Sequence, residues 1–171
     1  MYDNGWGVLK DDKLAVKWYR KSAEQGSARA QFNLGVMYDN GWGVLKDDKL
    51  AVKWYRKSAD QGNASAQLNM GVMYDNGWGV PKDYKLAVKW YRKSADQGNA
   101  SAQFNLGLMY RKGWGVPKDY VLAYMWFNIS ATNGDKDVEK SRDIVEKKMT
   151  PQQIADAQKL SREWLEKHRK K

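Results

Sequence analysis

Cysteine is absent from the chain, proline occurs three times, and histidine occurs once, at His168. The lack of cysteine excludes a disulfide framework and a cysteine-based metal site, although it leaves the cellular compartment open. This histidine lies in the charged tail 166–171, which is expected to fray, so we expect neither a Ser–His pair nor a histidine metal site. No strand precedes a Gly-rich phosphate loop, and no apolar run reaches the length of a membrane span. We therefore expect no enzyme, no metal, no cofactor and no membrane span.

What the chain has in abundance is repetition, with a period of 36 residues. Residues 12–47 and 48–83 differ at six positions, and residues 84–119 form a third copy. Such a period predicts a stacked array of structural repeats with one elongated core. The predicted divisions are a partial repeat at 1–11, repeats at 12–47, 48–83 and 84–119, a divergent repeat at 120–149, and a C-terminal capping helix with a basic tail at 150–171.

Apolar residues within one repeat follow helical spacing. In the copy at 48–83, Leu50, Ala51, Trp54, Tyr55 and Ala59 recur at i, i+1, i+4, i+5 and i+9. An aspartate before this run can cap the first helix, and a glycine after it can end it. The residue after that glycine is a preferred N-cap in every copy, so a second helix is expected to start there. These caps are Ser27, Asn63, Asn99 and Asp135.

The second helix of each repeat carries a glycine in its middle, at Gly35, Gly71 and Gly107. Such a glycine costs about 1 kcal/mol relative to alanine. Its recurrence predicts that a neighbouring helix packs too closely there for a Cβ atom. One repeat is therefore expected to be a helix hairpin, which buries its apolar face only by stacking on its neighbours.

These residues carry a resemblance to a known family. The run AVKWYRKSADQG followed by ASAQLNMGVMYDNGWGVPKD resembles the Sel-one-like repeat (SLR), a relative of the tetratricopeptide repeat, over about residues 1–134. The resemblance implies an all-α, right-handed superhelix of antiparallel helix hairpins that typically serves as an adaptor in protein complexes or bacterial signalling. The family has a cysteine-rich secreted branch, from which this chain differs. The resemblance does not imply which partner is bound.

The two ends of the chain differ from the repeats between them. Residues 1–8 align with 37–44, so the chain opens in the middle of a repeat, and we interpret the start as truncated or misplaced. A signal peptide would then escape notice, and the localisation stays open. The first complete helix is expected to expose apolar surface and to support self-association. At the other end, Thr150 to Gln153 resembles a helix start with a capping box, which predicts a capping helix.

Cations recur on one face of the first helix of each repeat, in a chain of net charge +10. They are Lys17, Arg20, Lys21, Lys53, Arg56, Lys57, Lys89, Arg92 and Lys93. This face could bind an acidic peptide, with arginine forming bidentate pairs to carboxylates. A solvated helix face, which we favour, has the same composition. Nucleic acid is not favoured, because twenty acidic residues are interspersed and no aromatic platform alternates with these cations.

A tryptophan stands between two glycines in each loop that leaves a repeat, at Trp6, Trp42, Trp78 and Trp114. An aromatic ladder of this kind could bind sugar rings or a proline-rich peptide. The alternative, which we favour, is that each indole folds back over the end of a neighbouring helix.

Two further sets of residues recur inside the helices. The Trp-Tyr pairs of the first helices are expected in the core, at Trp18-Tyr19, Trp54-Tyr55 and Trp90-Tyr91. Asn33, Asn69 and Asn105 could hydrogen-bond either a bound peptide or an adjacent helix.

The sequence as a whole predicts a non-catalytic scaffold for protein–protein interaction. The candidate contact residues are the nine cations named above together with Trp42, Trp78 and Trp114. The alternatives are a carbohydrate or cell-envelope binder that uses the tryptophan edge and, less favoured, an electrostatic binder of nucleic acid. The predicted partner is another protein or peptide of acidic character.

Overall fold

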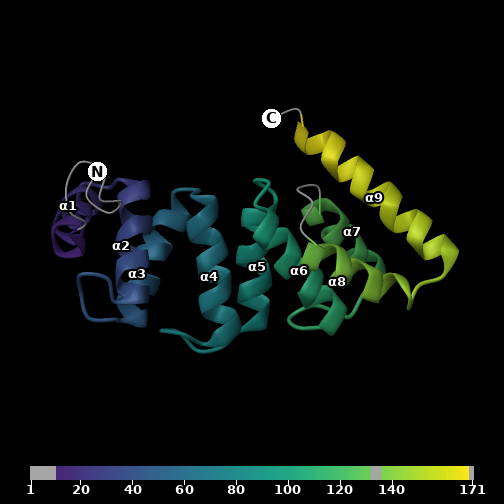
Figure 1. Ribbon diagram of the computed structural model, residues 1–171, viewed down its shortest axis with the longest axis horizontal. Coiled ribbons are helices and arrows are strands. Elements are labelled where there is room, and N and C mark those ends of the chain that lie inside the picture. The colour runs from purple at the N-terminus through teal and green to yellow at the C-terminus, as the bar shows by residue number, and fades with distance from the viewer. Residues whose placement is uncertain (1–10, 132–135, 170–171) are drawn as a thin grey trace. The chain divides into compact units, whose positions relative to one another are not determined.

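The chain is all-α over the residues that the computed structural model describes, 11–131 and 136–169 (Figure 1). The helices fall into two compact units, residues 1–82 and 83–171. The first unit contains α1 (Asp12–Glu24), α2 (Ala28–Asn40), α3 (Asp48–Asp60) and α4 (Ala64–Asn76). The second contains α5 (Tyr84–Ala95), α6 (Ala100–Lys112), α7 (Tyr120–Ser130), α8 (Lys136–Glu146) and α9 (Pro151–Arg169). Successive helices pair as hairpins, which confirms the predicted all-α repeat fold.

The predicted caps define where each hairpin begins. The Asp47 side chain accepts a hydrogen bond from the backbone amide of Leu50 at 2.9 Å, and Asp11, Asp83 and Asp119 do the same at their helices. The second helices are capped by Ser27, Asn63 and Asn99. The fourth expected cap, Asp135, lies outside the described residues. Each such cap contributes on the order of 1 kcal/mol to helix stability.

Consecutive hairpins pack closely at the mid-helix glycines. A Cβ atom at Gly35 of α2 would lie 2.6 Å from the Tyr55 ring of α3. In the second unit, a Cβ atom at Gly107 of α6 would lie 2.5 Å from the Phe127 ring of α7. Both distances are shorter than van der Waals contact, so alanine would force the rings to move. The prediction of a close helix neighbour is confirmed at these two positions.

A buried polar contact joins the hairpins of the first unit. The Tyr55 hydroxyl donates to Asp39 Oδ2 at 3.0 Å, and burial together with Asp39 raises the tyrosine pKa, so the hydroxyl stays protonated. Asn69 of α4 also hydrogen-bonds this tyrosine, so the asparagine serves an adjacent helix. In the second unit the equivalent positions hold Phe127 and Arg111. The hydroxyl donor and the carboxylate acceptor are thus replaced together. Neither group is left in the second unit without its hydrogen-bond partner.

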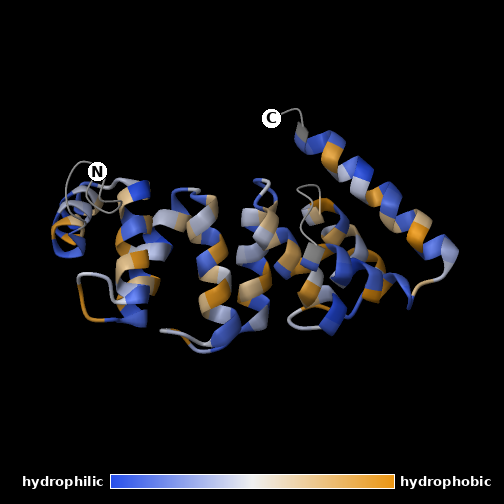
Figure 2. Cartoon of the chain, viewed as in Figure 1, coloured by the Kyte–Doolittle hydropathy of each residue, from blue (hydrophilic) through white to orange (hydrophobic). Residues whose placement is uncertain are grey.

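The C-terminal helix α9 packs on α7, and its start follows the predicted capping box. The Gln153 amide donates to Thr150 Oγ1 at 3.2 Å, and the Thr150 amide donates to Gln153 Oε1 at 2.9 Å. Figure 2 shows α9 as mostly hydrophilic with apolar residues at intervals. The apolar side meets α7, where Trp126 and Trp164 contact edge to face with ring centroids 5.6 Å apart. The predicted C-terminal capping helix is confirmed.

Trp18 corrects one expectation about the core. Trp54, Tyr55, Trp90 and Tyr91 are buried as predicted, but Trp18 of α1 is 49% exposed. The difference follows from the neighbours, because α3 packs between α2 and α4 whereas α1 packs mainly against α2 among the described helices. The first helix therefore exposes apolar surface, as expected from the sequence, and self-association through it stays a prediction.

Candidate functional site

The nine helix cations do not form a uniform surface. We call them the helix-A cations: Lys17, Arg20, Lys21, Lys53, Arg56, Lys57, Lys89, Arg92 and Lys93. All of them are exposed except Arg92, which is half-buried. The lysine that comes first in each copy, Lys17, Lys53 or Lys89, has no ion pair, hydrogen bond or ring contact within the described part of the chain. These three side chains are available to a partner.

The arginines of this set bridge the two helices of their own repeat. Arg20 donates from its guanidinium to the Tyr38 hydroxyl of α2 at 2.6 Å. Arg56 and Arg92 donate in the same way to Tyr74 and Tyr110. A guanidinium fixed to a part-buried phenol has fewer free N–H groups for a bidentate carboxylate pair. The sequence analysis missed this bridge, although the arginine and the tyrosine recur 18 residues apart in three copies.

The last lysine of each copy lies over the tryptophan of its own helix. The Nζ atoms of Lys57 and Lys93 are 4.8 and 4.5 Å from the ring centroids of Trp54 and Trp90. An ammonium group in this position is attracted to the ring by a cation–π interaction. These lysines shield core indoles, so those rings offer no platform for a base or a sugar.

In the divergent repeat the cationic face is replaced by a helix contact. Met125 and Ile129 stand where the third repeat has Lys89 and Lys93, and both are buried. The Ser161 hydroxyl of α9 lies 3.4 Å from the carbonyl oxygen of Met125. The replacement of cations by apolar residues therefore marks where α9 covers α7.

The loop that leaves each repeat folds back over the start of the same repeat. A Cβ atom at Gly43, Gly79 or Gly115 would overlap the backbone carbonyl of the first residue of α1, α3 or α5, respectively. All three glycines have a positive φ, which glycine alone adopts without strain. The loop backbone is thus packed tightly, whereas the favoured interpretation of the sequence concerned the indoles.

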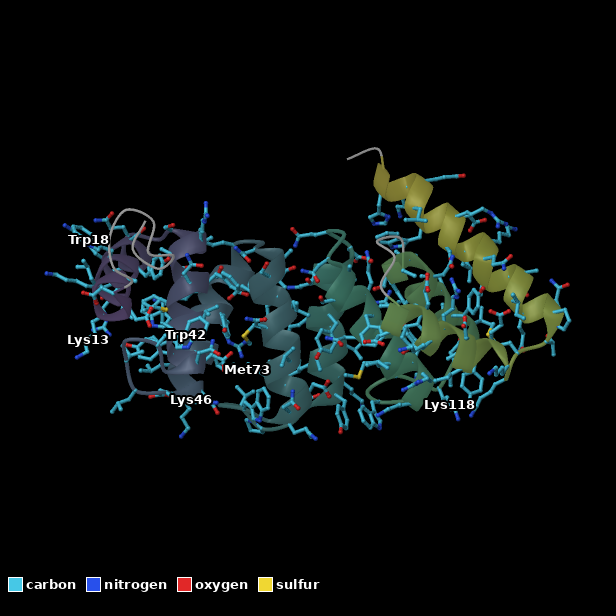
Figure 3. All side chains as sticks on the ribbon, viewed as in Figure 1. Lys13, Trp18, Trp42, Lys46, Met73 and Lys118 are labelled. Atoms are coloured by element: carbon cyan, nitrogen blue, oxygen red, sulfur yellow. The ribbon has the colours of Figure 1, made fainter. Side chains whose placement is uncertain are left out.

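The indoles of these loops remain half-exposed despite the packed backbone. Trp42, Trp78 and Trp114 expose 46%, 47% and 37% of their surface. Figure 3 labels Trp42 beside Lys46 of the same loop. Trp6, the remaining member of the set, lies outside the described residues. The loops thus combine a tightly packed backbone with tryptophan rings that are half in water.

The third loop differs from the first two. The Trp114 ring stacks on Tyr84 of α5 with centroids 5.1 Å apart, and Lys112 Nζ lies 4.0 Å above the indole. At the positions of Tyr84 and Lys112, the second repeat has Asp48 and Asn76. Tyr84 and Lys112 could have been noticed in the sequence as residues that differ from the first two repeats, but the prediction was built on residues that the repeats share.

Neither a metal site nor a membrane span is found in the part of the chain that the structure describes. No three His, Asp or Glu side chains gather there in a way that could hold a metal ion, and no helix there is long and apolar enough to span a membrane. His168 stacks on Trp164 at 3.9 Å, and its Nδ1 lies 2.8 Å from the Trp164 carbonyl oxygen. The histidine is thus accounted for by contacts within α9.

Comparison with protein families finds the Sel1 repeat, matched at residues 1–27, 28–63, 64–99 and 100–135. The last three matches start 36 residues apart, the period seen in the sequence, and each of these three begins with the second helix of a hairpin. A comparison with curated proteins found no match.

Solved structures similar to this chain include Sel1 repeat proteins. One is a protective antigen of uropathogenic Escherichia coli described as displaying an SLR fold, with 44% identity and a TM-score of 0.90, covering 98% of this chain and 36% of that one. Another is a Sel1 repeat protein from Oxalobacter formigenes, with 39% identity and a TM-score of 0.81, covering 95% and 66%. The cysteine-rich protein B of Helicobacter pylori shares the fold at 22% identity and a TM-score of 0.59, covering 75% and 92%. The chain thus spans about a third of the first relative's length.

Proposed function

The chain belongs to the Sel1 repeat family, whose members are generally protein-interaction scaffolds. On this basis we propose that it binds a partner protein through its half-exposed loop indoles. The observation that carries the proposal is the 46% and 47% exposure of Trp42 and Trp78 on loops whose backbone is tightly packed. Tryptophan is enriched among the residues that dominate binding energy at protein interfaces. A rigid loop also presents its side chain with little loss of entropy on binding.

The helix-A lysines give the proposed partner its charge. Lys17, Lys53 and Lys89 are exposed and have no contact within the described part of the chain, so they can approach carboxylates of an acidic partner without first breaking a bond. Each exposed pair contributes at most about 1 kcal/mol, so these lysines add to recognition rather than carry it.

Replacing Trp42 and Trp78 together by alanine is expected to abolish partner binding while lowering the melting temperature by only a few degrees. The reason is that half of each ring is already in water, so truncation removes little buried area. Partner binding is measured by affinity capture from a lysate of the source cells with quantitative mass spectrometry, and stability by circular dichroism.

Leu45→Pro is the matched control for this double variant. Leu45 is 91% exposed in the same loop as Trp42, and proline stands at the equivalent positions 81 and 117. Proline there should leave binding unchanged and stabilise the fold by about 0.4–1 kcal/mol, because it restricts the unfolded chain. Unchanged capture by the tryptophan variant, or a collapse of its stability, would contradict the proposal.

A carbohydrate ligand is the second candidate, because half-exposed indoles can also stack on sugar rings. The two functions separate by intrinsic tryptophan fluorescence. Soluble glycans should leave the emission of the wild-type protein unchanged if the partner is a protein, and should shift it in a saturable manner if the indoles bind sugars.

A further inference from the structure

The loops at the ends of α6 and α8 in the second unit carry a connected cluster of aromatic and cationic side chains. We call it the loop-edge cluster: Tyr84, Lys112, Trp114, Lys118, Tyr120 and Lys148. Figure 3 labels Lys118 in the loop between α6 and α7. None of its three lysines belongs to the helix-A cations, and the sequence analysis assigned a role to Trp114 alone.

The cluster consists of two groups of contacts. In the first, Tyr84 stacks on Trp114, and Lys112 lies over the same indole. In the second, Lys118 Nζ is 4.8 Å from the Tyr120 ring centroid, and Lys148 Nζ, from the end of α8, is 5.9 Å from it. The loop backbone links the two groups, because a Cβ atom at Gly113 would lie 3.2 Å from the Cβ of Lys118.

Lys118 has a ring beside it where its counterpart in the first repeat has a carboxylate. Lys46, the counterpart of Lys118 in the first repeat, forms an ion pair with Asp48 at 3.5 Å. Lys118 faces Tyr120, which occupies the position equivalent to Asp48. A hydrogen bond with Lys118 lowers the tyrosine pKa, and the positive charges of Lys118 and Lys148 act in the same direction. A ring holds an ammonium group in place without neutralising it.

The same change of charge occurs on the helix that precedes the third loop. Arg111 and Lys112 end α6, where the second repeat has Asp75 and Asn76. The nearest aspartate in sequence, Asp119, is committed as the N-cap of α7, where it accepts from the Leu122 amide at 3.0 Å. Asp119 offsets one of the positive charges of Arg111, Lys112 and Lys118, so residues 111–119 keep a net positive charge.

We propose that the loop-edge cluster is a binding site for a short acidic segment of a partner protein, read by the three ammonium groups of Lys112, Lys118 and Lys148. This inference rests on the proposed scaffold function and gives it a second surface and a ligand class. Carboxylates are the complement of ammonium groups that lie against aromatic rings in loops of net positive charge.

The occupied ring faces argue against ligands that bind by stacking. Tyr84 and Lys112 lie against the Trp114 ring, and Lys118 and Lys148 lie against the Tyr120 ring. A sugar or a nucleobase needs an open aromatic face. Binding along a nucleic acid backbone gains its affinity from many phosphate contacts, and this cluster offers three lysines.

The test is the binding of a fluorescein-labelled peptide with eight consecutive glutamates, measured by fluorescence anisotropy at low salt. The site variant is Lys112→Asn/Lys118→Gln/Lys148→Gln, in which Asn is the natural residue at the equivalent position 76. The control variant is Lys13→Gln/Lys49→Gln/Lys167→Gln, which removes the same charge at exposed lysines that belong to neither proposed surface. All six lysines are exposed, so both variants should fold like the wild type, as circular dichroism will verify.

The site variant should bind the peptide about ten-fold more weakly than the wild type, the loss expected for three exposed charge pairs, and the control variant by less than about two-fold. An equal loss in both variants would show attraction to net charge only and would overturn the inference. Tighter binding of an oligothymidylate of equal charge, with the same dependence on the three lysines, would assign the site to nucleic acid instead.

Failure of this inference is distinguishable from failure of the scaffold function. If the wild type does not bind the peptide but still captures a partner that depends on Trp42 and Trp78, the cluster is not an acidic-peptide site and the scaffold function stands. If peptide binding depends on the three lysines while capture is insensitive to the two tryptophans, the loop-edge cluster remains and the indole surface is withdrawn.

Discussion

Replacing Gly79 by alanine should lower the free energy of unfolding of the first unit by about 3 kcal/mol or more, whereas the same change at Gly62 should cost only about 1 kcal/mol. Both glycines have a positive φ, +66° at Gly79 and +91° at Gly62, so alanine is strained at either one. They differ in their surroundings. A Cβ atom at Gly79 would overlap the backbone carbonyl of Asp48 at the start of α3. A Cβ atom at Gly62 would meet no neighbouring atom within 4 Å.

The difference between Gly79→Ala and Gly62→Ala separates the free energy of packing the loop on α3 from the free energy of placing alanine at a positive φ. Backbone cannot rotate away as the end of a flexible side chain can, so the loop at Gly79 must lift from α3 and release Trp78 with it. Urea denaturation followed by circular dichroism measures both variants. Equal losses at the two positions would mean that the loop is not held against the helix start.

Trp126→Ala should destabilise the second unit by about 3–5 kcal/mol, the cost of emptying a large core site. Trp126 is 1% exposed, and its ring contacts Trp164 of α9. Its loss therefore removes both a core side chain of α7 and the anchor of the capping helix. Hydrogen exchange should show α9 losing protection before α5 and α6 do.

Trp114→Ala is the matched control in the same unit. Its ring is 37% exposed and stacks on a half-buried tyrosine, so we expect a loss of about 2 kcal/mol, less than that of Trp126→Ala. If the two variants unfolded at the same urea concentration, or if α9 stayed protected in Trp126→Ala, the packing of α9 on α7 would be contradicted.

Features shared by every copy predicted the fold, because they report what each hairpin needs in order to stack. The residue after the helix-ending glycine changes from Ser27 to Asn63 yet stays a cap, and Gly35 marks a real contact with Tyr55. The exposure of Trp18 could not be predicted from its own copy, since its sequence context is that of Trp54 and only the number of neighbouring helices differs.

Residues that differ between the repeats, in contrast to the shared ones, indicate the second candidate site. A residue that differs between two repeats of one fold is free of the stacking requirement, so its change can serve a ligand. Tyr84 and Lys112 are such departures, and their meaning became visible only when the structure placed both against Trp114. The exchange of Tyr55 and Asp39 for Phe127 and Arg111 is a departure of another kind, a paired change that removes both partners of a hydrogen bond at once.

The most direct test of a binding surface at the loop edge is the ¹H–¹⁵N spectrum of the nine indole N–H groups during titration with the glutamate peptide. Binding at the loop-edge cluster should move the Trp114 signal progressively and leave those of Trp54 and Trp90, which lie beneath helix-A lysines, in place. Saturable shifts at Trp54 and Trp90 with none at Trp114 would place the ligand on the helix-A surface and contradict the account.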